Sequence, residues 1–259
     1  MTKERLSKLP TSSPFIKKPF GGLTSTMLRT IAVILMLCDH MWATVIPGNN
    51  WLTNIGRLAF PIFAFLISEG FVHTSNLKKY ILRLLVFALI SEIPFNYFYG
   101  GGWLYPYHQN VMFTLLLGLL AISIIDKLKS NHSAKQIVKS AALLLLLSLA
   151  SAIGFVDYGF AGFLTVVMFY VFRNFPFAWV LQLVAMILMN ITFFRGEMAI
   201  VEIFGKTYEI ATQGYAVFAL IPIWLYGGKK GYSNKITQYG FYAFYPVHML
   251  VLYLILYFK

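Results

Sequence analysis

Ile31-Ala-Val-Ile-Leu-Met-Leu-Cys-Asp-His-Met-Trp-Ala-Thr-Val-Ile46 is an apolar run that carries an acidic residue and an imidazole, Asp39 and His40, side by side. An apolar run of this kind predicts a membrane-spanning helix. An ionisable side chain at membrane depth costs at least ~2.5 kcal/mol on insertion scales, so such residues normally face a bundle interior or a wet cavity. The pair therefore marks a candidate working site.

The composition extends the membrane prediction to the whole chain. Of the 259 residues, 59% are apolar and only 12% are charged, which is too few charged residues for a soluble domain. The net charge of +12 fits short cytoplasmic loops rich in Lys and Arg, and we expect no nucleic-acid binding because no soluble basic domain is apparent. The single cysteine, Cys38, excludes an internal disulfide and a Cys-based zinc site, and we expect no metal.

Nine apolar runs approach the ~20 residues that a spanning helix needs, and they predict an all-α, polytopic membrane helical bundle. We expect one membrane domain, residues 26–259, after a basic cytoplasmic arm, residues 1–25. The arm lacks a long apolar core and is not expected to be a cleavable signal peptide. The predicted spans are 26–46, 52–73, 79–98, 110–128, 137–156, 158–173, 176–194, 211–227 and 238–258.

Lys and Arg are distributed unevenly between alternate predicted loops. One side holds only Arg195 and Lys206, besides the terminal Lys259. Because cytoplasmic loops are enriched in Lys and Arg, we expect the N-terminus inside and the C-terminus outside. The basic side carries the N-terminal arm, Lys78-Lys79, Lys127, Lys129, Lys135, Arg173, Lys229-Lys230 and Lys235.

Residues 195–206, between the seventh and eighth predicted spans, are too few to cross the membrane. Their pattern is amphipathic, which is compatible with a rim helix in the outer interface. A loop with two short strands is an equally good interpretation. The sequence leaves both open.

Counting depth at ~1.5 Å per helical residue divides the ionisable residues into two groups. The outer group has the parts of general acid–base chemistry, because a carboxylate can orient an imidazole whose other nitrogen takes a proton. Its candidate catalytic residues are Asp39, His40, Arg57, Glu92, Asn110 and His248, with His108, Gln109 and Asp157 at the mouth.

Adjacent helical residues project ~100° apart, so Asp39 is not expected to bind the imidazole of His40. Partners on other helices are better placed, such as Arg57 for Asp39 or Glu92 for His40. Two structural alternatives stay open. Either histidine, His40 or His248, could make only a helix-bridging hydrogen bond, and Arg57 with Glu92 could be a structural ion pair.

The inner group lies close to the predicted cytoplasmic face. Glu69 and Arg83 could simply pair across the hairpin between the second and third spans. The same basic rim would also suit a polyanionic phosphate donor that approaches from the cytosol. The candidate donor-binding residues are Arg29, Lys78, Lys79, Arg83, Lys229 and Lys230.

Seven motifs, in order over roughly residues 24–257, resemble the TraX family. They are Leu35-Met-Leu-Cys-Asp-His40, the segment 56–71 that begins Gly-Arg-Leu-Ala-Phe-Pro, the segment 83–94 that ends Ser-Glu-Ile-Pro, His108-Gln-Asn-Val-Met-Phe-Thr-Leu115, Asp157-Tyr-Gly159, the segment 221–231 that begins Ile-Pro-Ile-Trp-Leu-Tyr, and Phe241-Tyr-Ala-Phe-Tyr-Pro-Val-His248.

TraX proteins are bacterial inner-membrane proteins, and the founding member is associated with N-acetylation of the amino terminus of conjugative pilin. The family is similar to the transmembrane acyltransferases, which carry an acyl group from cytosolic acyl-CoA across the membrane. The resemblance implies a multi-pass acetyltransferase of the bacterial cytoplasmic membrane, with acetyl-CoA as donor. His40 would match the first-helix histidine of those enzymes and His248 their late-helix histidine. Expected partners are membrane lipids, acetyl-CoA and a membrane-associated acceptor, either a protein amino terminus or a glycan.

In this mechanism His40 is the general base, Asp39 or Glu92 orients it, and Arg57 or Asn110 donates hydrogen bonds to the oxyanion. The alternative is a proton-coupled transporter or channel, because buried Asp, Glu and His side chains can relay protons. A chaperone for a membrane-inserted pilin or lipoprotein is a third hypothesis. The sequence leaves open the acceptor, N- or O-acylation, the acyl length and the oligomeric state.

Overall fold

The computed structural model describes residues 22–130, 132–193, 196, 198–203 and 205–259. Most of the predicted basic arm, residues 1–21, lies outside the described residues. The first helix, α1 (Ser25–Ala43), begins where the Thr24 side chain accepts a hydrogen bond from the backbone nitrogen of Met27. This N-cap satisfies one of the four free N–H groups of the first turn and fixes the start of the helix.

The second predicted span consists of two helices, α2 (Asn50–Gly56) and α3 (Ala59–His73). Together they form an apolar segment of 24 residues, long enough to cross a membrane. The chain is irregular at Arg57 and Leu58, between the two helices. Arg57 therefore lies at a break between two helices, and its side chain extends back toward Thr53 on α2.

Four further helices are long and apolar enough to span. Local signals set their ends, as in the third of the predicted spans, where Asn76 caps the start and Gly101 closes the end in a left-handed conformation at φ +68°. These helices are α4 (Leu77–Gly100), α5 (Val111–Ser130), α6 (Ala134–Ile153) and α10 (Lys235–Tyr257).

The all-α bundle is confirmed, whereas the count of nine spans is not. Across the described residues, six helical segments have the length and apolar composition of a span. The other three predicted spans correspond to shorter pieces, because turns at Tyr158 and Pro176 precede two of them and because the α-helical geometry in each piece is replaced in part by a 3₁₀ or π-helical segment. They are α7 (Gly159–Val171) with the 3₁₀ turn η2 (Phe172–Asn174), α8 (Ala178–Ile187) with the π-helical turn η3 (Leu188–Phe193), and the 3₁₀ segment η4 (Thr212–Ala219) with α9 (Leu220–Trp224).

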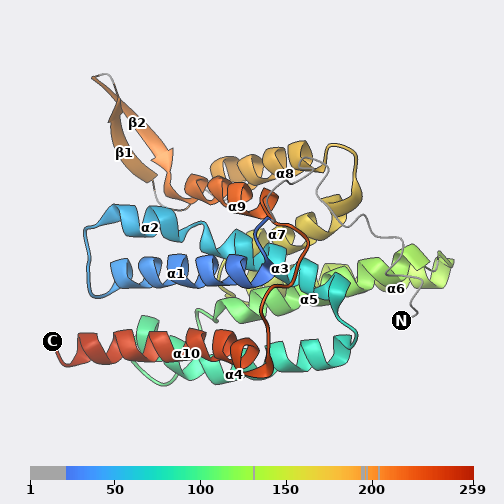
Figure 1. Cartoon of the computed structure of the whole chain (residues 1–259), viewed down its shortest axis with the longest axis horizontal. Coiled ribbons are helices and arrows are strands. Elements are labelled where there is room, and N and C mark those ends of the chain that lie inside the picture. The colour runs from blue at the N-terminus through green and yellow to red at the C-terminus, as the bar shows by residue number, and fades with distance from the viewer. Residues whose placement is uncertain (1–21, 131, 194–195, 197, 204) are drawn as a thin grey trace.

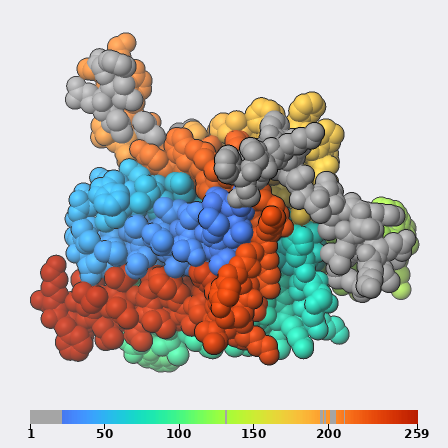
Figure 2. Space-filling model, in the orientation of Figure 1, coloured from blue at the N-terminus to red at the C-terminus, as the bar shows by residue number. Residues whose placement is uncertain are grey.

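The segment after η3 forms a β-hairpin rather than a rim helix. Its strands, β1 (Met198–Ile203) and β2 (Lys206–Ala211), pair antiparallel with Ile200 opposite Glu209. Gly205 in the turn has φ +72°, a conformation that glycine adopts without strain. The hairpin projects from the helical bundle (Figures 1 and 2), and the structure thus decides between the two alternatives left by the sequence.

Helix α1 lies between α2 and α10 and also contacts α3 (Figure 1). Its start is tied to the segment before α10, where Ser25 N donates to Lys229 O and the Thr26 hydroxyl donates to Tyr232 O. Helices α1 and α10 therefore begin at the same end of the bundle and run side by side. This arrangement brings their histidines together further along.

Candidate active site

His40 on α1 and His248 on α10 form a buried pair. Nδ1 of His40 lies 2.6 Å from Nε2 of His248, and the two rings are parallel within 1°. Only 8% and 6% of their surfaces are exposed. His248 is held in turn through Nδ1, which lies 2.8 Å from the Phe244 carbonyl oxygen. The sequence predicted both residues for one group but not their direct contact.

Asp39 faces away from this pair, toward α2. Its Oδ1 accepts a hydrogen bond from the Thr53 hydroxyl at 2.6 Å, and Nη2 of Arg57 lies 3.4 Å from the same oxygen. Arg57 also donates to the Thr53 oxygen at 2.8 Å. The predicted Asp39–Arg57 pairing is therefore present, with Thr53 as a bridge. Gly56 permits the close approach, because a Cβ there would overlap Cβ of Asp39.

Glu92 pairs with Asn110 and not with the predicted partner, His40. The Asn110 amide donates to Glu92 Oε2 at 2.5 Å and to the Ala88 carbonyl oxygen at 2.9 Å. Asn110 is fully buried at the start of α5. The alternative ion pair between Glu92 and Arg57 is also not formed, because Asp39 on α1 takes the guanidinium.

Two tyrosines connect the outer residues. The phenol of Tyr158, at the start of α7, interacts electrostatically with Asp157, Arg57 and Asp39, and that of Tyr99 interacts with the same three charges. Asp157 lies 3.4 Å from Nε2 of His108 at the mouth of α5. Most of the predicted outer group thus converges in space.

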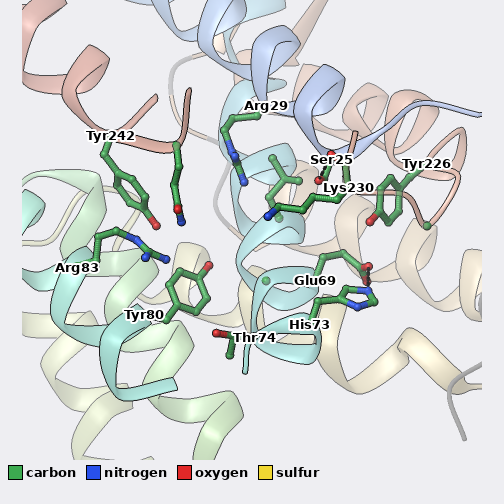
Figure 3. Close-up of a pocket in the computed structure, with 14 residues that line it drawn as sticks. Ser25, Arg29, Glu69, His73, Thr74, Tyr80, Arg83, Tyr226, Lys230 and Tyr242 are labelled. Carbon is green, nitrogen blue, oxygen red and sulfur yellow. Dashed lines mark hydrogen bonds and ion pairs between the residues drawn. The ribbon is translucent and has the colours of Figure 1, made fainter. Parts of the chain in front are cut away.

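A cavity of about 390 Å³ opens at the other end of α1, where α3 ends and α4 and α10 begin (Figure 3). Of the six predicted donor-binding cations, Arg29, Arg83 and Lys230 line it. Lys78, Lys79 and Lys229 are exposed and do not line it.

Arg83 is held by aromatic rings at the wall of this cavity. Its guanidinium carbon lies 5.5 Å from the ring centre of Tyr80 and 5.3 Å from that of Tyr242, as cation–π contacts require. Its Nε has no hydrogen-bond partner among the described residues. The guanidinium is thus positioned by two aromatic faces, while its Nε–H donates to no described residue.

Glu69, the carboxylate of this cavity, binds Arg173 and lies 3.4 Å from Nε2 of His73. The predicted Glu69–Arg83 pair is therefore wrong, because the carboxylate of Glu69 binds the guanidinium of Arg173, on η2, instead. Burial, followed by the charge of Glu69, raises the pKa of Tyr226 to about 12. With Glu69 already paired, the cavity presents three further cations to a ligand.

The family profile described as TraX protein matches residues 24–256, which include every residue named in both sites. The chain belongs to the TraX family. It is 28% identical over 249 residues to a probable fimbrial assembly protein FimC, serogroup H1, of Dichelobacter nodosus, covering 87% of this chain and 92% of that protein. It is 25% identical over 139 residues to Protein TraX of Escherichia coli strain K12, covering 53% and 52%. No solved structure matches this TraX-family chain.

Three site residues of this TraX-family protein were missed from the sequence. Thr53 reads as an ordinary apolar-helix residue, and its only signal is its place one turn before Arg57 on the same face. Tyr99 and Tyr158 lie near helix ends, where tyrosines are common at membrane interfaces, so the sequence does not distinguish them from other aromatic residues. The sequence signal for Tyr158 is its place in the family motif Asp157-Tyr-Gly159.

Proposed function

We propose that this chain is a membrane-embedded acetyltransferase that moves an acetyl group from cytosolic acetyl-CoA to an amine or hydroxyl group at the outer half of the bacterial inner membrane. The observation that carries the proposal is the buried contact between His40 and His248. A neutral, buried imidazole oriented by a second group is the usual form of a general base.

The proposed reaction needs one proton acceptor and no metal. The acceptor nitrogen or oxygen bonds to the thioester carbonyl carbon while its proton passes to His40. The carbon–sulfur bond then breaks, and the leaving sulfur takes the proton from His40 to give free CoA. Acetyl-CoA and the acceptor are thus converted into the acetylated acceptor and CoA, with all atoms accounted for.

Arg57 is better suited than Asn110 to stabilise the oxyanion. Both amide hydrogens of Asn110 are directed at protein oxygens, those of Glu92 and Ala88. Nε of Arg57 is buried without a partner among the described residues, and its charge interacts with His40. A free donor near the base is what a developing negative charge requires.

The cavity at the start of α1 is the proposed site for the phosphates of the donor. Arg29, Arg83 and Lys230 supply three cations, and guanidinium and ammonium groups are the usual ligands of phosphate oxygens. In the orientation predicted from Lys and Arg this end faces the cytosol. The long pantetheine arm of CoA would then extend along α1 toward His40.

The acceptor is proposed to be the amino terminus of a membrane-associated protein, with a glycan hydroxyl as the other candidate. The name of the Dichelobacter nodosus relative, a probable fimbrial assembly protein, favours pilin-type subunits as the first acceptors to test. The relative covers nearly the whole chain, which makes it the more informative of the two comparisons.

The test is acetyl transfer by the purified full chain reconstituted in lipid vesicles. Acetyl-labelled acetyl-CoA is supplied with pilin-type amino-terminal peptides and with glycans, and the label in each product is measured. We expect transfer by the wild type, loss in His40→Gln, and unchanged transfer in His132→Ala, which alters an exposed histidine. Absence of labelled product, or full activity in His40→Gln, contradicts the proposal. Proton-coupled solute flux without transfer would instead support the transporter.

A further inference from the structure

We infer that His248 is a positioning residue that fixes the tautomer of His40, so that Nε2 of His40 is the atom that takes the proton. The inference deepens the proposed function and rests on it for the catalytic part. It starts from the contacts of His248, since these determine which ring nitrogens carry hydrogen.

The anchor of His248 is a backbone carbonyl. Nδ1 of His248 lies 2.8 Å from the Phe244 oxygen, one turn earlier on α10. A carbonyl oxygen accepts hydrogen bonds and never donates them, so Nδ1 of His248 must carry the hydrogen. The ring of Phe244 also stacks on the imidazole of His248, with ring centres 4.8 Å apart. The ring centre of Tyr245 lies 5.8 Å from that of the imidazole. The hydrogen bond to Phe244 and the contacts with these two aromatic rings together hold the ring of His248 in one orientation.

The tautomer of His40 follows from that of His248. A neutral imidazole with hydrogen on Nδ1 has a lone pair on Nε2, and this Nε2 lies 2.6 Å from Nδ1 of His40. Two lone pairs at that distance would repel, so Nδ1 of His40 carries the hydrogen and donates it. The remaining nitrogen, Nε2 of His40, then has the free lone pair. A relay runs from the backbone through His248 to one defined basic atom.

The relay has a chemical consequence in the transfer step. When Nε2 of His40 takes the proton of the acceptor, the ring becomes an imidazolium, and its Nδ1–H bond to His248 becomes charge-assisted and stronger. The same Nε2–H then returns the proton to the leaving sulfur. Because the bond strengthens only while His40 is charged, it favours the transition state over the ground state. His248 thus acts through His40 and does not touch the reacting atoms.

A purely structural contact would predict something different. A hydrogen bond that only joined α1 to α10 would stabilise the bundle modestly and would leave the rate of transfer by folded protein unchanged. The variants that separate the two roles are His248→Leu, which removes the acceptor, and His248→Gln. The amide oxygen of the latter can accept the hydrogen of His40 Nδ1.

The first measurement is nitrogen-15 NMR of the full chain, labelled at histidine, in lipid nanodiscs at neutral pH. The chemical shifts distinguish protonated from unprotonated ring nitrogens, and single substitutions assign the signals of each histidine. We expect hydrogen on Nδ1 in both His40 and His248, with a through-bond coupling between the facing nitrogens. Hydrogen on Nε2 of His40 in the wild type overturns the inference. This readout needs no acetyl transfer, so it stands apart from the proposed function.

The second measurement is the kinetics of acetyl transfer by the same variants. We expect His248→Leu to lower kcat by about 10²-fold, the usual contribution of a positioned acid–base group, with KM for acetyl-CoA unchanged. His248→Gln should recover a large part of this loss. Equal kcat in the wild type and His248→Leu, both folded, overturns the positioning role. No transfer by the wild type, with the expected tautomers, would contradict the proposed function alone.

Discussion

Arg29 and His40 lie about three turns apart on α1, so one helix carries both a cation of the basic cavity and a member of the buried histidine pair. At 1.5 Å per residue the separation along the axis is about 16 Å. The proposed donor site and the proposed base are thus linked by a rigid element, and the distance between them is set by the sequence of α1.

Replacing a cation of the cavity should weaken donor binding. Arg83→Gln removes a guanidinium that is held between Tyr80 and Tyr242, and we expect the Kd for acetyl-CoA to rise about tenfold, since a charged hydrogen bond contributes ~1.5–3 kcal/mol. Calorimetry with CoA and with dephospho-CoA measures the effect. Lys127→Gln, on an exposed residue elsewhere, is the matched control. Equal affinity of wild type and Arg83→Gln for CoA would exclude the phosphate assignment.

The hydroxyl group of Thr53 should stabilise the fold, because it bridges Asp39 and Arg57. Thr53→Val keeps the shape but leaves Oδ1 of Asp39 and Nη2 of Arg57 without their bridge. We expect a loss of about 1–3 kcal/mol in the free energy of unfolding, because buried polar groups are left unsatisfied. Denaturant unfolding in mixed micelles measures it, and Thr53→Ser, which keeps the hydroxyl, should be close to wild type. A stable Thr53→Val protein would show that Asp39 and Arg57 pair adequately alone.

Gly56 should not tolerate a side chain. In Gly56→Ala the new Cβ would overlap Cβ of Asp39, so α2 must move away from α1. We expect a destabilisation of about 1–3 kcal/mol, typical of overpacking, measured by the same unfolding experiment. The control is Gly240→Ala on α10, where a Cβ meets no atom within 4 Å. If both variants unfold alike, the contact between α1 and α2 is looser than the structure indicates.

The phenol of Tyr226 should lose its proton at a higher pH than an ordinary tyrosine. Burial, followed by Glu69, raises its pKa from the ordinary 10.0 to about 12. A raised pKa in the folded state means that its contribution to stability is full below about pH 10 and disappears as the pH rises through about 12. The tyrosinate absorbance of the wild type minus that of Tyr226→Phe should have its midpoint near pH 12, and Glu69→Gln should lower that midpoint. A midpoint near the ordinary value of 10.0 would contradict the buried position.

The orientation predicted from Lys and Arg can be tested with single cysteines. Cys38→Ser removes the only cysteine, after which Asn49→Cys and Ser75→Cys place a thiol at opposite ends of the α2–α3 segment, both at exposed positions. A membrane-impermeant maleimide added to intact cells should label the thiol at position 49 from the outside. It should reach the thiol at position 75 only after the membrane is opened. The reverse pattern would invert the orientation and place the basic cavity outside.

The sequence by itself determined which parts of the chain are apolar helices and where many of them begin and end. Six of the nine predicted apolar runs form helical segments long enough to span a membrane. The caps at their starts, such as Thr24 and Asn76, bind a backbone nitrogen only three residues further along. The ~100° step between adjacent residues was enough to predict that Asp39 and His40 face different neighbours. These properties are local, so a single sequence contains them.

Only the tertiary structure decided which polar groups meet. His40 and His248 are 208 positions apart, and Glu69 and Arg173 are 104 apart. Hydrophobic periodicity does not fix how a helix in an apolar surrounding is rotated or which helix lies beside it, because lipid and protein interiors are similarly apolar. The pairings Glu92–Asn110 and Glu69–Arg173, and the three cations that line the cavity, therefore depend on packing. Each charged side chain binds the partner that helix packing places closest to it.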